Sequence, residues 1–430
     1  MTAPPESASP PDRTIPGAFG RLLAASAFSL LGFRIMALAM PLVAVVALEA
    51  SAFMVSVVAA AQTVAFLLFG LPAGALVDRL RRRHVLVFCD FGRAVALAFV
   101  PIAWWSGVLS ISHLIVVAFT IGVLTMLFDV ADQTYLPEIV SSDRLIRSNS
   151  RLVMVDQVTG IAGPGVGGLL IQAISAPFTL IVTCLGYLWS GTLLAGIKDG
   201  SRPRPRAGRR AFGKEIAEGV RAVMADPLLR PIVFCSTTQT LFWSVAFLML
   251  LVLLADELAV NAATIGLLLT LGSLGGVLAS LLVNRLIAVL GDGRAMRLGV
   301  AIGGLCTILA ALTQPDWRLL LVSVASFGLG FGLVVYNVAQ VSFRQRRVPS
   351  HLLGRVNATV RFFAWGARPI GSLLGGTLAA LLSVRHAVFI GAIGTSLAAL
   401  WLYLSPLRHM DVLPVNRVNI EPQAKEAGSK

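Results

Sequence analysis

Long apolar runs of about 20 residues recur along this sequence and restrict its fold more than any other feature. A helix rises about 1.5 Å per residue, so such a run is long enough to cross a hydrocarbon layer about 30 Å thick. Hydrophobic residues make up 57% of the 430 positions and charged residues only 13%, with a mean hydropathy of +0.83. A soluble domain of this length needs more charge on its surface. The sequence therefore predicts an all-α protein that crosses a membrane many times.

Twelve runs are predicted to span the membrane, and a longer polar stretch separates them into two groups of six. The expected spans are 22–48, 52–76, 84–107, 112–134, 149–174, 178–197, 230–255, 263–288, 297–314, 318–342, 356–383 and 386–405. The chain is thus expected to have five parts. These are a tail (1–21), a first six-helix half (22–197), a linker (198–229), a second six-helix half (230–405) and a second tail (406–430).

The 35 lysines and arginines are distributed unevenly among the loops. Most of them fall in the two tails, the linker and alternate short loops, whereas the other set of loops contains only Arg318 and Arg385. Cytoplasmic loops carry the excess of basic residues in membrane proteins. Both termini are therefore expected in the cytoplasm, and the protein in the plasma (inner) membrane. The net charge of +14 is spread over separate loops and forms no basic stripe, so no nucleic-acid partner is expected.

The linker begins with a segment rich in proline and arginine, "KDGSRPRPRAGRR". It continues with Phe212, Ile216, Val220 and Val223 at helical spacing. This pattern predicts an amphipathic helix on the inner membrane surface. Its expected role is to tether the two halves.

The two halves repeat each other in sequence. A shift of 208 residues places Arg147 over Arg355, and the same register pairs several glycines, including Gly163 with Gly371. A similar shift places "LVDRL" (76–80) over "LVNRL" (282–286), with Asn284 where the first half has an aspartate. Each half contains an even number of spans, so the two copies have the same orientation. They should be related by an axis along the membrane normal, which is the plan of one large class of transporters.

Several motifs give the sequence a family resemblance. "GALVDRLRRR" (74–83) resembles the loop 2–3 signature of the major facilitator superfamily, G-x-L-x-D-R-x-G-R-R, with Arg81 in place of the second glycine. "LFDVADQTYLPEIV", "RSNSRL", "GPGVGGLL" and "GRVNATVRF" resemble a subgroup of bacterial exporters that includes siderophore and macrolide efflux proteins. The resemblance implies two pseudo-symmetric halves around a central cavity that spans 1, 4, 7 and 10 line.

The resemblance also implies a latch on the cytoplasmic side. Asp78 is expected to approach the start of span 11, near Arg355, when that side is closed. The helix dipole would favour a carboxylate there by about 0.3–1 kcal/mol. The arginines of the loop also fix it in the cytoplasm. The predicted latch residues are Gly74, Asp78, Arg79, Arg82, Arg83 and Arg355.

Charged residues inside the spans are the best candidates for a site, because charge in a membrane is costly and usually faces a cavity. Arg34 is expected near the midplane, where it needs an anion from either a protein carboxylate or a substrate. Asp129 and Asp132 are the candidates for carrying a coupling proton, and the repeat places neutral Asn337 opposite Asp129. The predicted lining residues of the cavity are Arg34, Asp129, Gln239, Trp243, Tyr336 and Asn337.

Two differences from the family pattern bear on proton coupling. Span 4 has no arginine, although many drug–proton antiporters of the superfamily carry one there. In many relatives an aspartate follows the glycine of span 1, whereas this sequence reads Gly32-Phe33-Arg34. The proton site of those relatives therefore does not transfer directly to this chain.

No motif indicates an enzyme or a cofactor. "GPGVGG" fits the dinucleotide pattern G-x-G-x-x-G, but it lies inside a span with no strand before it. The four cysteines have no CxxC spacing, so neither a disulfide nor a metal site is expected.

The sequence thus predicts a secondary active transporter. It is expected to export a small amphipathic molecule, a drug or secondary metabolite, by alternating access and proton antiport, as a monomer in the lipid bilayer. An importer or facilitator of the same fold and a siderophore exporter remain open alternatives. A non-transporting membrane sensor is less favoured, because no further domain is visible.

Overall fold

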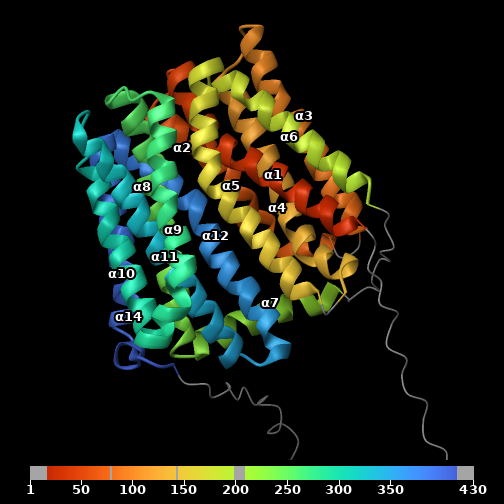
Figure 1. Ribbon diagram of the computed structural model, residues 1–430, viewed down its shortest axis with the longest axis vertical. Coiled ribbons are helices and arrows are strands. Elements are labelled where there is room, and N and C mark those ends of the chain that lie inside the picture. Colours follow the sequence, from red (N-terminus) through yellow and green to blue (C-terminus); the bar gives the residue numbers. More distant parts are fainter. Residues whose placement is uncertain (1–16, 78–79, 142–143, 198–208, 414–430) are drawn as a thin grey trace, which may run out of the picture.

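The computed structural model describes residues 17–77, 80–141, 144–197 and 209–413, and these are helical, with no strand among them. The first half contains α1 (Ala18–Leu42) with its extension η1 (Val43–Ala47), α2 (Ala52–Val77), α3 (Arg82–Trp105), α4 (Ile111–Ile139), α5 (Leu145–Ile174) and α6 (Ala176–Ala195). The linker forms α7 (Arg209–Ala225). The second half contains α8 (Leu229–Val252) with η2 (Leu253–Glu257), α9 (Ala262–Leu290), α10 (Asp292–Ala311), η3 (Trp317–Leu319), α11 (Leu320–Arg347), α12 (Ser350–Leu381), α13 (Val384–Leu397), α14 (Leu400–Tyr403) and η4 (Pro406–His409). Figure 1 shows the two halves side by side.

Eleven segments of the described chain are long and apolar enough to cross a membrane. The remaining long helix of the second half is α12, whose 32 residues include Arg355, Arg361 and Arg368. At about 1.5 Å per residue this helix is easily long enough to span the membrane. The predicted fold, twelve helices in two six-helix halves, is confirmed. Because of these arginines, α12 is more polar than the eleven segments that are long and apolar enough to cross a membrane.

The sequence repeat is also a repeat of backbone geometry. At the same point in each half, α1 and α8 end in a five-residue π-helical turn, η1 and η2. Two residues after each turn, Glu49 and Ala259 adopt positive φ angles of 50° and 46°. Few side chains tolerate this conformation. The two halves therefore share even a strained detail of their loops.

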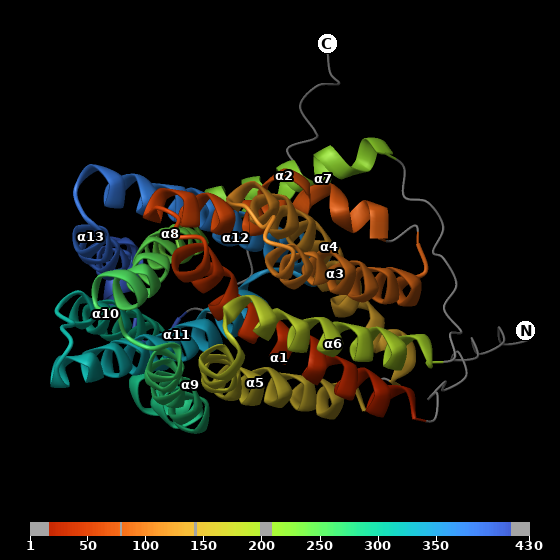
Figure 2. The same cartoon turned by 90° about the horizontal axis from the view of Figure 1, so that it is seen from above.

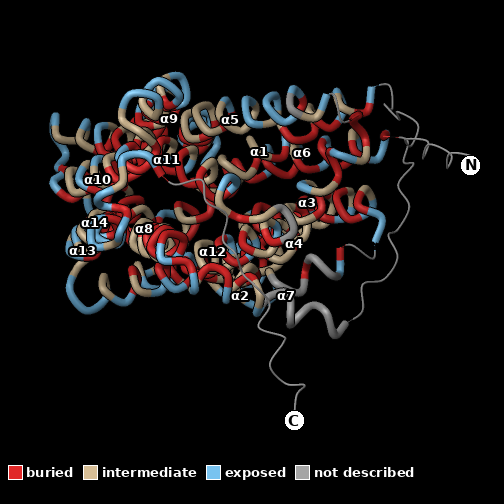
Figure 3. Tube along the Cα trace, turned by 90° about the horizontal axis from the view of Figure 1, so that it is seen from below, coloured by how far each residue is buried: buried red, intermediate tan, exposed pale blue. Residues whose placement is uncertain are grey.

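The two halves pack against each other through two pairs of helices. Figure 2 shows α2 beside α12 on one side of the boundary and α5 beside α9 on the other. Figure 3 shows exposed residues on the outward surfaces of both halves, where lipid would contact them. The faces of α1, α4 and α12 that point toward the centre of the bundle lie between the α2–α12 contact and the α5–α9 contact.

Glycines bring the halves together at one end of the bundle. We call the end where α7 lies the linker end, and the end with η1 and η2 the far end (Figure 1). Near the far end, a Cβ on Gly168 of α5 would lie 2.4 Å from the carbonyl oxygen of Ala262. A Cβ on Gly376 of α12 would lie 2.0 Å from the hydroxyl of Ser56. In this conformation the far end is closed by direct backbone packing between the halves.

We expect Gly168→Val to disrupt this closed packing. Overpacking of this kind costs about 1–3 kcal/mol, so the midpoint of thermal denaturation should fall. An engineered cysteine at Ser56, which is fully buried in the closed far end, should also react faster with a membrane-impermeant maleimide. Gly70→Val in α2 is the matched control, because a Cβ on Gly70 meets no atom within 4 Å. Equal denaturation midpoints for the two variants would contradict this account of the far end.

The linker helix α7 is packed on the second half, where an amphipathic helix on the membrane surface was expected. Ala222 and Val223 are buried in the core of the second half. A Cβ on Gly219 would lie 2.7 Å from the carbonyl oxygen of Arg355, so α7 touches the backbone of α12. Glu218 forms an ion pair with Arg355. Val223 of the predicted apolar face thus packs against the second half, whereas the side chains of Phe212 and Ile216 lie outside the described residues.

Candidate functional site

Polar side chains from both halves meet at the centre of the bundle. The helices that contribute them are α1, α4 and α5 of the first half and α12 of the second. We call the group the central cluster, and its members are Arg34, Asp129, Gln133, Asp156, Arg361 and Arg368.

Arg34 of α1 pairs with Asp156 of α5. The guanidinium Nη2 donates to the carboxylate Oδ1 at 2.8 Å. The two side chains retain 38% and 41% of their exposure, so this pair is still accessible. The sequence left open whether a protein carboxylate or a substrate supplies the anion for Arg34. In this conformation the anion is Asp156.

The glycine-rich segment of α5 explains how this pair fits between two helices. A Cβ on Gly163 would lie 2.3 Å from the Cβ of Arg34, so only glycine allows α5 to approach α1 there. On the opposite face of α5, Thr270 of α9 donates to the carbonyl oxygen of Ile161 at 3.1 Å. The "GPGVGG" run therefore packs α5 against both halves, which is a packing role and not a nucleotide site.

Asp129 of α4 faces the second half. It is partly exposed and lies within electrostatic range of Arg361 and Arg368 of α12. One turn further along α4, the Gln133 side chain accepts a hydrogen bond from Arg361. Asp132 lies between these positions in sequence, and its Oδ1 is buried without a hydrogen-bond partner in the described structure. Both carboxyl groups predicted to carry the coupling proton thus lie at or next to the central cluster.

One face of α12 presents two arginines around a tryptophan. The guanidinium carbons of Arg361 and Arg368 lie 5.2 and 5.0 Å from the ring centroid of Trp365. Phe66 of α2 packs edge-on against the same ring, with 4.6 Å between the centroids. We call Arg361, Trp365 and Arg368 the arginine–tryptophan stack. It belongs to the second half and contacts the first.

The lining residues predicted in the second half have different surroundings. Asn337 is exposed and Trp243 is half-buried, with its ring 5.1 Å from that of Phe247. Gln239 is buried, and its amide nitrogen has no hydrogen-bond partner in the described structure. The expectation for Tyr336 needs correction, because this residue is only 1% exposed. Its hydroxyl bonds within the second half, at 2.9 Å from the carbonyl oxygen of Ile232, so it packs helices and does not face a ligand.

Part of the predicted latch lies outside the described residues, namely Asp78 and Arg79, while Gly74 lies in α2. Arg82 at the start of α3 pairs with Glu138 at the end of α4. Arg83 donates to the carbonyl oxygen of Leu194 at 3.2 Å, at the end of α6. These two arginines therefore fix helix ends within their own half. Arg355, expected beside Asp78 when that side is closed, pairs with Glu218 of the linker helix.

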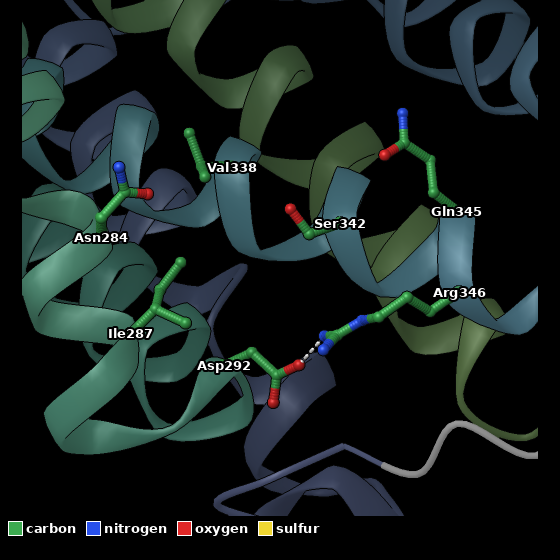
Figure 4. Close-up of a pocket in the computed structure, with 7 residues that line it drawn as sticks. All are labelled: Asn284, Ile287, Asp292, Val338, Ser342, Gln345 and Arg346. Carbon is green, nitrogen blue, oxygen red and sulfur yellow. Dashed lines mark hydrogen bonds and ion pairs between the residues drawn. The ribbon is translucent and has the colours of Figure 1, made fainter.

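The second half has its own version of the Arg82–Glu138 ion pair, with the charges exchanged. Asp292, the first residue of α10, pairs with Arg346 near the end of α11. The sequence shift of 208 places Arg346 over Glu138. The exchanged pair borders a pocket of about 380 Å³ at the linker end. Figure 4 shows this pocket with Asn284, the counterpart of Asp78, on its wall.

The second intramembrane ion pair of the first half is inaccessible. Asp90 and Arg93 of α3 lie three residues apart on one face of the helix and form an ion pair, with side-chain exposures of 0% and 3%. The Arg93 guanidinium lies between the rings of Phe128 and Tyr187, at 4.2 and 4.5 Å from their centroids. This cluster has a structural role, because no ligand can reach it in this conformation.

Sequence analysis did not select Asp156, Arg361, Trp365 or Arg368 as site residues. The arginines did leave a signal, because α12 is the one long helix of the second half that is not among the eleven segments apolar enough to cross a membrane in the described chain. Intramembrane charge that faces a cavity makes a residue a candidate for a site. Which charges face each other depends on the packing of α12 against α2 and α4.

The fold and the cluster together define the class of protein. Twelve helices in two repeated halves, with charge shared between the halves at the centre, are the architecture of a membrane transporter of the major facilitator type. The family model of the transmembrane secretion effectors matches residues 11–427. The chain therefore belongs to this family of the major facilitator superfamily.

Similar proteins of known name are exporters. The chain is 30% identical to the multidrug efflux pump Tap of Mycolicibacterium fortuitum over 388 residues, which is 84% of this chain and 90% of that protein. It is 26% identical to the enterobactin exporter EntS of Escherichia coli O9:H4 (strain HS) over 285 residues, 65% of this chain and 66% of the exporter.

Solved structures support the fold assignment. A bacterial homologue of the iron transporter ferroportin, in an inward-facing state, superposes with a TM-score of 0.72 at 16% identity, covering 91% of this chain and 99% of the homologue. The nucleoside transporter NupG superposes with a TM-score of 0.70 at 13% identity, covering 90% and 99%. At these identities the similarity is one of fold alone.

Proposed function

We propose that this chain exports a small amphipathic molecule across the inner (plasma) membrane by alternating access, in exchange for protons. The observation that carries this proposal is the central cluster, in which charged side chains from both halves face each other at the level of the membrane. A charged cluster at the boundary between two repeats is where transporters bind substrate and coupling ions. One chain supplies both halves, so a monomer suffices.

The orientation follows from the distribution of basic residues. The linker end carries α7, which contains Arg209, Arg210 and Lys214, and the basic end of α11. The positive-inside rule assigns this end to the cytoplasm, so both termini are cytoplasmic. Because the far end is closed by glycine packing, the proposed route of the substrate to the central cluster is from the cytoplasmic side. Release on the other side requires the halves to separate at Gly168 and Gly376.

Protons are the proposed coupling ion, because the cluster contains carboxyl groups that can bind and release them. Asp129 lies within electrostatic range of the arginines of α12, and Asp132 lies one turn closer to the linker end. A substrate that needs ionised Asp129 would be displaced when a proton binds from the outside. This competition would couple outward transport of substrate to inward movement of protons.

The proposal is tested with purified protein in liposomes. Dye-loaded vesicles of known orientation should release substrate faster when an imposed pH gradient drives protons against the direction of substrate movement. A panel of aromatic dyes and drugs identifies the substrates. Transport of every compound at the rate of empty liposomes would reject export. Accumulation in the opposite direction would favour the alternative of an importer of the same fold.

A siderophore exporter is the second candidate. It is favoured by the similarity to EntS, which is named for the export of enterobactin. A catecholate siderophore included in the same panel separates this candidate from a drug exporter.

A further inference from the structure

The arginine–tryptophan stack differs from the other charged groups of the bundle. Its three residues are four and three positions apart on α12, so they share one face of the helix. Both arginines are exposed, although they lie well inside the helix. Both guanidinium groups lie against the same aromatic ring, which limits the directions in which they can point.

Neither arginine of the stack has a carboxylate within 4.0 Å among the described residues. The hydrogen-bond partner of Arg361 is the neutral Gln133. By contrast, Arg34 has Asp156 and Arg93 has Asp90. Asp129 is near enough to act on both stack arginines electrostatically, but it is in direct contact with neither. Two cations therefore share one carboxylate at a distance.

Two exposed guanidinium groups inside a membrane-spanning bundle, neither with a carboxylate in contact among the described residues, leave N–H donors free to bind an anion. The planar fork of arginine matches a carboxylate, sulfonate or phosphate group with two parallel hydrogen bonds. Beside the two forks, Trp365 and Phe66 supply aromatic surface on which a flat apolar ring can pack. The stack thus combines the two features that an aromatic acid requires.

We propose that Arg361, Trp365 and Arg368 select the substrate, and that the substrate is an aromatic molecule carrying an anionic group. The inference rests on the export function proposed above and specifies its substrate class. The anionic group binds between the two guanidinium groups, and the aromatic ring packs beside Trp365.

Asp129 places a second condition on the substrate. A purely anionic ligand would bind better once Asp129 is protonated, because protonation removes a competing negative charge. Exchange of substrate for a proton instead requires a ligand that donates a hydrogen bond to ionised Asp129. An aromatic acid that also carries a hydroxyl or amino group satisfies both conditions.

The test compares two dyes that share a xanthene ring system and differ in charge. In a buffer acidic enough to keep its xanthene hydroxyl protonated, fluorescein is an anion with a phenolic hydroxyl group, and rhodamine 123 is a cation. Binding to the full-length protein in phosphatidylcholine nanodiscs is measured by fluorescence anisotropy. We expect fluorescein to bind more tightly than rhodamine 123. Arg361→Gln and Arg368→Gln should each weaken fluorescein binding about tenfold or more, equivalent to about 1.4 kcal/mol, without weakening rhodamine 123 binding.

Arg318→Gln is the matched control, because Arg318 is an exposed arginine at the far end, away from the stack. Arg361→Lys and Arg368→Lys keep the charge and remove the planar fork, so they should weaken fluorescein binding less than the glutamine variants. They also provide the test if a glutamine variant does not fold, which thermal denaturation will reveal.

Tighter binding of rhodamine 123 than of fluorescein by the wild type would overturn the inference. Fluorescein affinity within twofold of wild type in both glutamine variants would also overturn it. If liposomes containing the wild type still export rhodamine 123 or another cation, the export function stands and only the substrate class is wrong. If no compound of any charge is exported, the proposed function itself fails.

Discussion

Asp129→Asn is expected to abolish the part of export that a pH gradient drives, while downhill exchange continues with weakened substrate binding, because asparagine resembles the protonated carboxyl group. Asparagine keeps the shape of the side chain and its ability to accept a hydrogen bond, but it cannot bind and release a proton in the cycle. The position lies within electrostatic range of Arg361 and Arg368, so an ionised carboxylate there offsets part of their positive charge. The measurement is efflux from liposomes with and without a pH gradient, with the membrane potential clamped by valinomycin and equal potassium concentrations.

The control for this prediction is Asp132→Asn, one turn closer to the linker end. Asp132 has a buried carboxylate oxygen without a partner, so its replacement tests whether a neighbouring acid carries the proton. If gradient-driven efflux persists in Asp129→Asn and disappears in Asp132→Asn, the proton is carried by Asp132. If it persists in the double variant, the coupling depends on neither residue.

Most of the fold could be predicted from hydropathy alone, because each span must satisfy the same physical requirement. The predicted spans and the helices differ only at their ends; for example, 263–288 was expected where α9 covers Ala262–Leu290. The π-helical turns η1 and η2 could not be predicted, since a change from α- to π-helical hydrogen bonding leaves no trace in the apolar pattern. Their presence at equivalent places nevertheless agrees with the sequence repeat.

The site was less predictable than the fold, because it depends on which helix faces meet. The requirement that Arg34 have an anion follows from the cost of burying charge, but a single sequence does not tell which carboxylate is near. Tyr336 shows the opposite error. Its place in span 10 suggested a lining role, yet the residue faces α8 within its own half. A span that lines the cavity has only one face toward it, and the sequence does not show which of its residues lie on that face.

The charge-exchanged ion pairs show what pseudo-symmetry preserves. In the first half the cation begins α3 and the anion ends α4, whereas in the second half the anion begins α10 and the cation ends α11. Either arrangement fastens the same two helix ends. Both halves therefore have an ion pair at this place, although the residues that form it differ. A search for identical residues in the two halves would miss this pair.

Removing the two partners of the Arg34–Asp156 ion pair, one at a time and together, tests whether they interact directly. Arg34→Ala leaves the Asp156 carboxylate without its partner, and Asp156→Ala leaves the guanidinium without its own. Both side chains keep more than a third of their exposure, so water can hydrate the group left behind, and each single variant should lower the stability in thermal denaturation by only about 0.2–1 kcal/mol. The double variant Arg34→Ala/Asp156→Ala leaves no unpaired charge and should recover much of the lost stability. This non-additivity is the mark of a direct interaction.

Arg34→Lys separates a structural pair from a substrate ligand. If Asp156 is the permanent partner, lysine keeps the charge and should retain much of the stability and of the substrate affinity. If Arg34 instead leaves Asp156 to hold an acidic group of the substrate, lysine cannot reproduce the planar fork, and affinity should fall about tenfold or more with little change in stability. Binding and thermal denaturation of the same preparation distinguish these outcomes. We expect the first, because the stack on α12 already offers two guanidinium groups without a carboxylate in contact, whereas Arg34 is satisfied by Asp156 at 2.8 Å.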